Sequence, residues 1–270
     1  MHWSRIAHRA MVTGVLGAGL CLLPAAPAYA GAWTLPEGTG QVIATPLYSD
    51  SGKGFDANGD VADIPDYRKA ELYVLLEYGL TDDVTLVAKP SLTNLSVEGA
   101  GDSGGIGYTE LGGRYRVYAR GETVVSLQAL ARVPGEKRRS NLAQVGGDTM
   151  EYDLRGLVGR SFRLGGAKAF LDLQAGYRLR SGRPPNEFHI DATLGVDVGR
   201  KTQILAQVFN TVSDGRGTGA FTDYRYHNAQ LSVVQTIAPN MSLQIGALGT
   251  IAGRNALRER GVFAGWWVRF

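Results

Sequence analysis

Apolar and polar side chains alternate along most of this chain with a period of two. The clearest example is the segment 67–80, in which one face is apolar and the opposite face is mostly polar. The apolar face carries Ala70, Leu72, Val74, Leu76 and Tyr78, and the other face carries Lys69, Glu71, Tyr73, Leu75 and Glu77. This period is typical of β-strands whose two faces meet different surroundings, and no apolar stripe with helical spacing persists for long. The pattern therefore predicts an all-β protein.

Twelve such segments follow one another, separated by residues that favour turns. They span about 40–48, 68–79, 84–95, 108–119, 123–133, 150–160, 169–180, 188–198, 202–210, 226–236, 241–251 and 258–270. An even number of antiparallel strands returns both chain ends to the same side, as in single-chain bacterial barrels. Short connections at 80–83, 120–122, 161–168, 199–201 and 238–240 predict periplasmic turns. Longer connections between them, such as 49–67 and 96–107, predict outer loops.

The last strand ends on an aromatic residue. Counting back by twos from Phe270 gives Val268, Trp266, Ala264 and Val262, an apolar face, whereas the opposite face is mixed. Because every backbone N–H and C=O in hydrocarbon must be paired within the protein, only a closed sheet can span a membrane with strands. We therefore predict an antiparallel transmembrane β-barrel of about 12 strands. Pro46 and Pro90 lack a ladder donor and are expected near the outer rim.

The first thirty residues have the features of a secretory signal peptide. Arg5 and Arg9 precede an apolar run over 10–23, and Ala28-Tyr29-Ala30 supplies the small residues of a cleavage site. We predict a signal peptide at 1–30 and an outer-membrane β-barrel at 31–270. No later stretch approaches the roughly 20 apolar residues of a membrane helix, so a membrane crossing is expected to use strands.

Loss of the signal peptide changes the composition in two ways. It removes Cys21, the single cysteine, which excludes disulfides, thiolate zinc sites and cysteine nucleophiles from the mature chain. It also removes two of the 28 basic residues and none of the 25 acidic ones, which leaves 26 basic against 25 acidic residues. A nearly neutral chain lacks the basic surface that nucleic-acid binding requires. No cofactor is expected.

Charged side chains of both signs are predicted to point into the lumen. The cations are Lys69, Lys89, Arg114, Arg116, Arg132, Arg155, Arg178, Arg180 and Arg269, and the anions are Glu71, Glu77, Glu110, Glu151, Asp153, Asp172, Asp191, Asp197 and Glu259. Under one interpretation these charges pair and fill a narrow interior; under the other they line a water-filled path for a small solute. We favour the path, because twelve strands enclose more than the eight whose interior side chains can fill. The balance of signs argues against a strong preference for anions or cations.

Aromatic residues allow a structural and a solute-binding interpretation. Those near predicted strand ends are expected to form interfacial girdles: Tyr48, Tyr78, Tyr108, Tyr177, Trp266 and Phe270. Tyr73 and Phe170 fall mid-strand on inward faces and are candidates for contact with a passing apolar solute. Packing within the barrel is the simpler alternative for both.

The segment Asp56-Ala57-Asn58-Gly59-Asp60 resembles part of a calcium loop, with oxygen side chains at alternate positions. It lacks the distal Glu at the required spacing, and Asp and Asn also favour Gly-rich turns for backbone reasons. We predict a turn without a metal, with calcium binding as the alternative.

A barrel hydrolase is the main alternative function. Outer-membrane phospholipases activate a Ser hydroxyl with a nearby His. Beyond residue 30 the sequence has two histidines, His189 and His227, and neither has a Ser two residues away. His189 is a lumen candidate that shares a face with Asp191, which either orients its imidazole or forms a buried pair. A nucleophile from a neighbouring strand stays an open alternative.

Three motifs resemble those of a known group of proteins. They are Ala32-Trp33-Thr34-Leu35-Pro36-Glu37-Gly38 before the first strand, Phe55-Asp56-Ala57-Asn58-Gly59 in the first loop, and Glu77-Tyr78-Gly79-Leu80-Thr81-Asp82 at the first turn. The last motif is common among barrels generally. The chain thus resembles a family of outer-membrane transporters described as similar to proteins of the phenol meta-degradation pathway.

The resemblance implies passive passage of small organic solutes, aromatic or hydrophobic ones included, across the outer membrane of a Gram-negative bacterium. The expected partners are the lipid bilayer, the small organic solute and the outer-membrane barrel assembly machinery, and no catalytic residue is expected. We expect selection to depend on lumen width, on the paired charges and on how the first outer loop folds over the mouth. The alternatives are the barrel hydrolase and a closed structural or adhesion barrel.

Overall fold

The computed structural model describes residues 31–135, 149–219 and 221–270. The predicted signal peptide at 1–30 lies outside the described residues, so its boundary stays a prediction. The described residues form β1 (Gly40–Phe55), β2 (Val61–Thr81), β3 (Val84–Lys89), β4 (Ser91–Val97), β5 (Gly101–Ile106), β6 (Thr109–Arg120), β7 (Thr123–Val133), β8 (Glu151–Leu164), β9 (Ala167–Arg180), β10 (Glu187–Asp197), β11 (Thr202–Ser213), β12 (Arg225–Ala238), β13 (Met241–Arg254), β14 (Ala256–Leu257) and β15 (Arg260–Arg269). They contain no helical segment with the length and apolar character that a membrane span requires.

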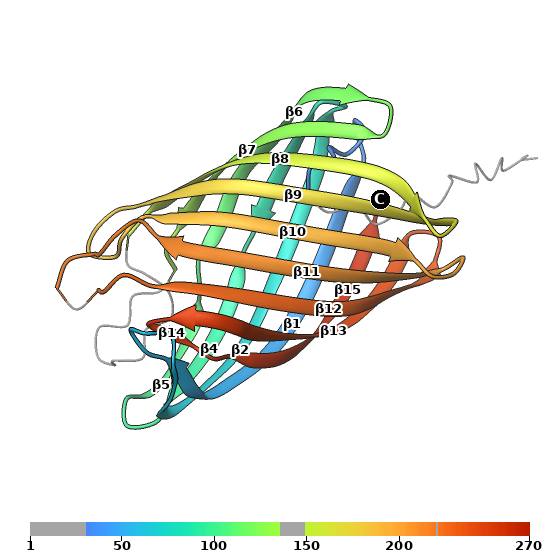
Figure 1. Ribbon diagram of the computed structural model, residues 1–270. Coiled ribbons are helices and arrows are strands. Elements are labelled where there is room, and N and C mark those ends of the chain that lie inside the picture. Colours follow the sequence, from blue (N-terminus) through green and yellow to red (C-terminus); the bar gives the residue numbers. More distant parts are fainter. Residues whose placement is uncertain (1–30, 136–148, 220) are drawn as a thin grey trace, which may run out of the picture.

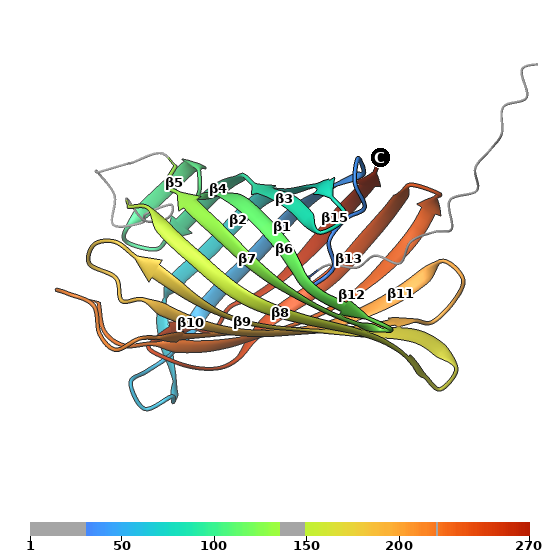
Figure 2. The same cartoon turned by 90° about the horizontal axis from the view of Figure 1, so that it is seen from above.

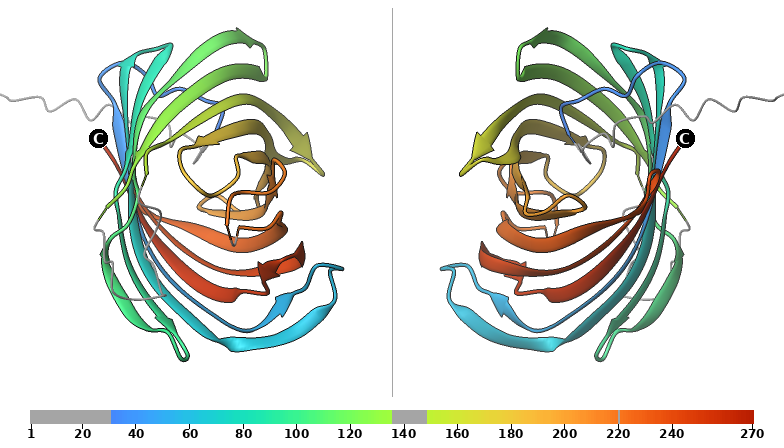
Figure 3. Two further views of the ribbon diagram at one scale, coloured as in Figure 1. Left: turned by 90° about the vertical axis from the view of Figure 1, so that its left-hand side faces the viewer. Right: turned by 90° about the vertical axis from the view of Figure 1, so that its right-hand side faces the viewer.

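The strands close into one antiparallel ring (Figures 1 and 3). β1 pairs with β2 along one edge, from Gly40 opposite Tyr78 to Phe55 opposite Val61. Along its other edge β1 pairs with β15. The seam ends on two hydrogen bonds: Gly40 N donates to Phe270 O at 2.7 Å, and Phe270 N donates to Gly40 O at 2.9 Å. Closure leaves the ring without a free edge, which is the condition for a strand-built membrane span.

Twelve strands make up the wall, because two wall strands are each interrupted once. β3 and β4 both pair with β2 and are separated only by Pro90. β5 and β6 form the next wall strand, in which β5 pairs with β4 and β6 pairs with β3. β14 is a two-residue strand that pairs with the end of β1, on the edge that β15 also occupies. The predicted twelve-stranded antiparallel barrel is confirmed, but part of the predicted loop 96–107 is strand β5.

The prolines do not lie at the rim as expected. Pro90 interrupts its wall strand midway between Val84 and Val97. It has no N–H to donate to the ladder, but its carbonyl oxygen accepts a hydrogen bond from Val74 N at 3.1 Å. Pro46 sits within β1 opposite Leu72, and the pairing with β15 skips Thr45 and Pro46. Both prolines are accommodated by local breaks in pairing with one neighbour rather than by placement at a strand end.

The two faces of the wall differ as the period of two predicts. Outward side chains form a broad apolar belt, with Ile245 69% exposed. The belt includes Leu76, Leu86, Leu92, Leu111, Leu127, Leu154, Leu173, Ile190, Leu231, Ile245, Val262 and Trp266. An exposed apolar belt around a closed barrel with charged side chains inside is the arrangement that hydrocarbon favours.

The connections divide the barrel into two ends. Tight turns and Phe270 lie at one end, here called the turn end, and the longer connections lie at the opposite loop end (Figure 1). The strands cross obliquely between them (Figure 2). The connection predicted at 161–168 is shorter than expected, because β8 and β9 pair as far as Leu164 and Ala167. Gly165 and Gly166 make this two-residue turn with φ of 56° and 86°, angles that suit glycine in a tight hairpin.

The first predicted outer loop, 49–67, is mostly a paired hairpin. β1 and β2 continue their ladder to Phe55 and Val61, which leaves only 56–60 as a turn. The hairpin therefore prolongs the wall at the loop end. Asp56 Oδ1 accepts Asn58 N at 2.7 Å and Asp60 N at 2.9 Å. These backbone donors lower the pKa of Asp56, so the bonds are kept above the ordinary carboxyl pKa and are lost as pH falls through the lowered value.

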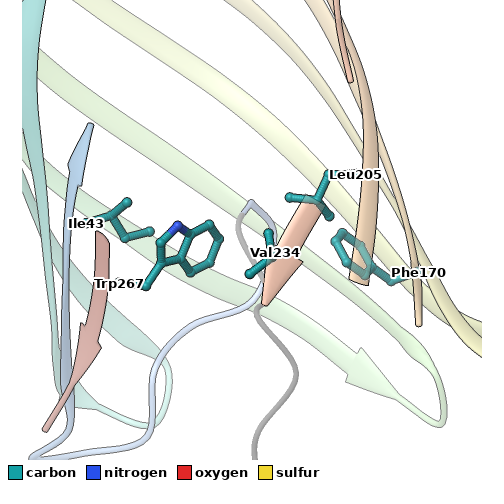
Figure 4. Packing of buried hydrophobic residues seen from close by; sticks show 5 residues of the cluster. All are labelled: Ile43, Phe170, Leu205, Val234 and Trp267. Carbon is teal, nitrogen blue, oxygen red and sulfur yellow. The ribbon is translucent and has the colours of Figure 1, made fainter. Parts of the chain in front are cut away.

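An apolar layer fills the interior near the turn end (Figure 4). Side chains from five wall strands form it: Ile43, Phe170, Leu205, Val234 and Trp267. Trp33, from the segment that precedes β1, and Leu75 pack against this layer. Apolar side chains thus occupy the middle of the interior near the turn end.

Candidate functional site in the barrel interior

A network of ion pairs covers the inner face of β8, β9 and β10. Glu151, which is 2% exposed, accepts Arg180 Nε at 2.9 Å and also pairs with Arg132. Arg180 Nη1 reaches Glu187 Oε1 at 2.9 Å, so one guanidinium joins two carboxylates on neighbouring strands. Buried charges are tolerated when they are paired and hydrogen-bonded in this way.

The network continues along the same wall. Arg178 Nη1 lies 3.1 Å from Glu187 Oε2, and its Nη2 lies 3.0 Å from Asp153 Oδ2. Arg155 then joins Asp153 and Asp191, each at 2.6 Å. On this wall the charges satisfy one another across strands, which corresponds to the interpretation of a filled interior.

The adjoining part of the wall encloses a chamber of about 290 Å³, which meets the ion-pair network at Arg132. It is lined from β2, the interrupted wall strands β3 to β6, and β7 by Tyr67, Lys69, Glu71, Tyr73, Lys89, Ser91, Thr93, Leu95, Gly107, Tyr108, Glu110 and Arg132. Tyr67 also lines a wider vestibule of about 830 Å³ nearer the loop end. Between the two spaces Lys69 Nζ lies 3.2 Å from Glu259 Oε1 and 3.8 Å from Glu71 Oε2.

Lys89 is held loosely in the chamber. Its Nζ lies 4.0 Å from Glu110 Oε2, whereas Arg132 Nε lies only 3.0 Å from Glu110 Oε1 and is the closer partner of that carboxylate. The ammonium group sits 4.8 Å from the centre of the Tyr73 ring, and the Lys89 side chain is 37% exposed. A cation beside an aromatic face offers a site where an anionic or polarisable ring can bind.

The segment 31–39 turns into the barrel and crosses its interior near the turn end (Figure 3). Ala32 is fully buried; its N–H donates to Asp172 Oδ2 at 2.6 Å and its carbonyl accepts Ser126 Oγ at 2.5 Å. Leu35 N donates to Thr85 Oγ1 at 2.8 Å. These bonds reach three separate wall strands, so the segment is fastened across the lumen.

Arg114 binds this segment directly and is itself held by Glu77. Its Nη2 lies 2.8 Å from Glu77 Oε1, and its Nη1 donates to Trp33 O at 2.9 Å. The Trp33 ring meets Phe170 edge-on, with ring centres 5.6 Å apart. Phe170 is therefore covered by Trp33, and the packing interpretation applies to it rather than solute contact.

Two predicted residues lie elsewhere than expected. Arg116 stays in register opposite the buried Ser126, but its guanidinium pairs with Asp83 of the β2–β3 turn at 2.7 Å, at the turn end rather than along the lumen. Tyr108 was predicted in a girdle but points inward, with its hydroxyl donating to Glu151 Oε1 at 3.2 Å and Arg132 over its ring at 4.4 Å. Tyr108 lies at the interruption between β5 and β6, where the break in the strand turns its side chain toward the interior.

His189 contacts Glu187 and Thr211 rather than the predicted partner Asp191. Its Nε2 lies 3.1 Å from Glu187 Oε2, and its Nδ1 lies 3.3 Å from Thr211 Oγ1, whereas Asp191 is engaged by Arg155. Thr211 supplies a hydroxyl from a neighbouring strand, but this residue is only 4% exposed. The Thr211 hydroxyl therefore has little exposure to solvent. Glu187, the carboxylate on the other side of the imidazole, is held by two arginines. Among the described residues no group of three or more His, Cys, Asp or Glu is placed to hold a metal ion.

The sequence pattern did not predict every residue that lies in the interior. Glu187 lies just before the predicted strand 188–198 and was not a lumen candidate, yet it joins Arg178, Arg180 and His189. Its spacing of two from His189 was a usable signal. The segment 31–39 gave no such signal, because it has no alternation and its place depends on hydrogen bonds to distant strands. Whether the predicted lumen residues line a solute path stays a prediction.

No protein-family model matches the chain, and a search of curated proteins finds no match. Solved structures do match. The COG4313 outer membrane channel from Pseudomonas putida F1 has a TM-score of 0.74 at 17% identity, over 88% of this chain and 98% of that chain. The NanC porin has a TM-score of 0.55 at 7% identity, over 84% and 98%. The translocator domain of the autotransporter NalP from Neisseria meningitidis has a TM-score of 0.50 at 13% identity, over 87% and 90%. The chain therefore has the fold of a bacterial outer-membrane β-barrel.

Proposed function

We propose that this protein is a channel or facilitator in the outer membrane of a Gram-negative bacterium, for passive passage of small organic solutes. The observation that carries the proposal is the chamber beside Tyr73 and Lys89, which shares the lining residue Tyr67 with the vestibule at the loop end. A structural or adhesion barrel has no need for such a chamber. The solved channels with the same fold support the proposal.

The lining of the chamber favours aromatic solutes. Tyr67, Tyr73 and Tyr108 present ring surface, and a space of about 290 Å³ suits a single-ring molecule. Lys89 adds a loosely paired cation for a polar substituent. This matches the solutes implied by the resemblance to the phenol meta-degradation group. The lumen-lining set proposed here is Lys69, Glu71, Tyr73, Glu77, Lys89, Arg114, Arg132, Glu151, Asp153, Arg155, Asp172, Arg178, His189 and Asp191, with Arg116 at the turn end.

Replacing Tyr73 by Leu is expected to weaken binding of an aromatic anion in the chamber. With benzenesulfonate as the probe, the wild-type protein in a planar bilayer should show transient blockades of its ionic current. Loss of a ring contact worth about 1 kcal/mol should raise the apparent dissociation constant by about fivefold. Methanesulfonate, which lacks the ring, should block neither protein.

Tyr78→Leu is the matched control, because Tyr78 lies on the same strand as Tyr73 but on its outward face, where it is exposed. Equal weakening in both variants would contradict binding at Tyr73. A wild-type barrel that carries no current would contradict the channel itself and favour the closed structural barrel.

We also propose that the last strand is recognised by the outer-membrane barrel assembly machinery. Phe270 is 67% exposed at the seam, next to the apolar outward face of β15. Phe270→Ser is expected to reduce the amount of folded barrel in outer membranes, measured by heat-modifiable mobility on gels. Unchanged folded protein in cells would contradict this role.

A further inference from the structure

Asp172 is a buried carboxylate without a cationic partner among the described residues. It lies on the inner face of β9 and is 1% exposed. Gln174 Nε2 donates to Oδ1 at 2.8 Å and Ala32 N donates to Oδ2 at 2.6 Å, and no described Lys, Arg or His lies within 4.0 Å. The carboxylates of Glu77, Glu151, Asp153 and Asp191 each have an arginine. A buried charge held only by neutral donors is costly unless a counter-charge arrives.

Gly31 lies directly against this carboxylate. A Cβ built on Gly31 would fall 2.1 Å from Asp172 Oδ2 and 2.4 Å from Oδ1, so only glycine fits here. Its φ of 104° is also one that side-chain-bearing residues rarely adopt. The α-nitrogen of Gly31 is bonded to the same Cα, so a positive charge on that nitrogen would stand beside Asp172.

The sequence places a cleavage signal at this same position. Ala28-Tyr29-Ala30 predicts cleavage after Ala30, which would make Gly31 the first residue of the mature chain. Two unrelated observations thus meet at one bond. The signal-peptide pattern comes from residues before it, and the uncompensated carboxylate comes from a strand about 140 residues away.

We propose that cleavage between Ala30 and Gly31 frees an α-ammonium group that forms a buried ion pair with Asp172 and thereby fixes the segment 31–39 across the lumen. Hydrolysis of that peptide bond leaves the carboxylate on the signal peptide and the ammonium on Gly31. The ammonium supplies the counter-charge that Asp172 lacks. Processing of the chain and fastening of the inner segment are thus the same step.

The first test is the identity of the mature N-terminus. Protein purified from outer membranes should have the intact mass of residues 31–270 and yield Gly31 as its first residue. A different first residue would overturn the proposal.

The second test is the reactivity of that terminus in the folded barrel. Reductive methylation with formaldehyde should modify the α-amine of the wild type slowly relative to exposed lysines. In Asp172→Asn, which keeps the shape of the side chain but removes its charge, the rate at the α-amine should rise by about tenfold or more. Asp197→Asn, which removes an inner-face carboxylate bonded to Gln203, is the control and should leave the rate unchanged. Equal rates in wild type and Asp172→Asn would overturn the ion pair.

A variant with one additional glycine directly after Ala30 provides a measurement that leaves Asp172 intact. The ammonium is then one residue too far along the chain, and its reactivity should rise as in Asp172→Asn. Because both changes remove the same contact, combining them should add little further. Additive effects would contradict a direct pair. These measurements do not depend on transport, so they remain decisive if the proposed channel function fails.

Discussion

Deleting residues 33–38 is expected to raise the single-channel conductance of the barrel several-fold. The segment 31–39 crosses the interior near the turn end and is fastened to Asp172, Ser126 and Thr85. Without it, the remaining residues before β1 are too few to cross the lumen, and water and ions gain the space that Trp33 occupies. Conductance in planar bilayers at fixed salt concentration measures the change. Retaining Gly31 and Ala32 keeps the residues that follow the predicted cleavage site.

Two further variants separate a local effect from a general loosening of the barrel. Trp33→Gly should give a smaller increase, because it removes the ring but keeps the backbone bonds. Deleting Ala57 and Asn58 from the exposed β1–β2 turn should leave conductance unchanged, because that turn prolongs the wall at the other end. An unchanged conductance in the 33–38 deletion would show that the narrowest part of the path lies elsewhere.

Glu151→Gln is expected to destabilise the folded barrel more than any exposed charge change. Glu151 is buried and accepts Arg180, Arg132 and the Tyr108 hydroxyl. The substitution leaves two buried guanidinium groups short of negative charge, a loss of about 3–5 kcal/mol when one partner of a buried pair is removed. Reversible unfolding in urea, from lipid vesicles or detergent, measures the free energy of unfolding.

Glu122→Gln is the matched control, because Glu122 lies in the exposed β6–β7 turn. A change there should stay within about 0.5 kcal/mol. A loss for Glu151→Gln as small as that of the control would indicate that the ion pairs in the interior are solvated and individually weak.

The barrel was predictable because membrane strands repeat one simple rule. Each residue of β2 between Lys69 and Tyr78 faces either lipid or the interior, and the side-chain period exposes that choice directly in the sequence. Closure followed from the physical requirement that backbone groups in hydrocarbon be paired. Strand lengths beyond the membrane were underestimated, as in the β1–β2 hairpin, because paired strands in water have no need of an apolar face.

The candidate site was predictable only in part. The signs and facing of the charges on β8 and β9 followed from alternation, but their partners depend on the register between strands, which a single sequence does not fix. Tyr108 points inward after the interruption between β5 and β6, and Arg116 pairs with Asp83 of the β2–β3 turn, a contact that alternation alone does not predict. Asp172 could be placed on an inner face, but the segment that meets it carries no periodic signal.

The strand that completes the ring is joined directly to the segment that occupies it. β1 meets β15 only after the rest of the chain has been laid down, and the residues just ahead of β1 then lie on the inside of the finished wall. The N-terminal segment does not have to be threaded through a barrel that has already closed. It can enter the lumen while the last hydrogen bonds between β1 and β15 form. Closure of the barrel and insertion of the N-terminal segment into its lumen are therefore expected to be one concerted event in folding.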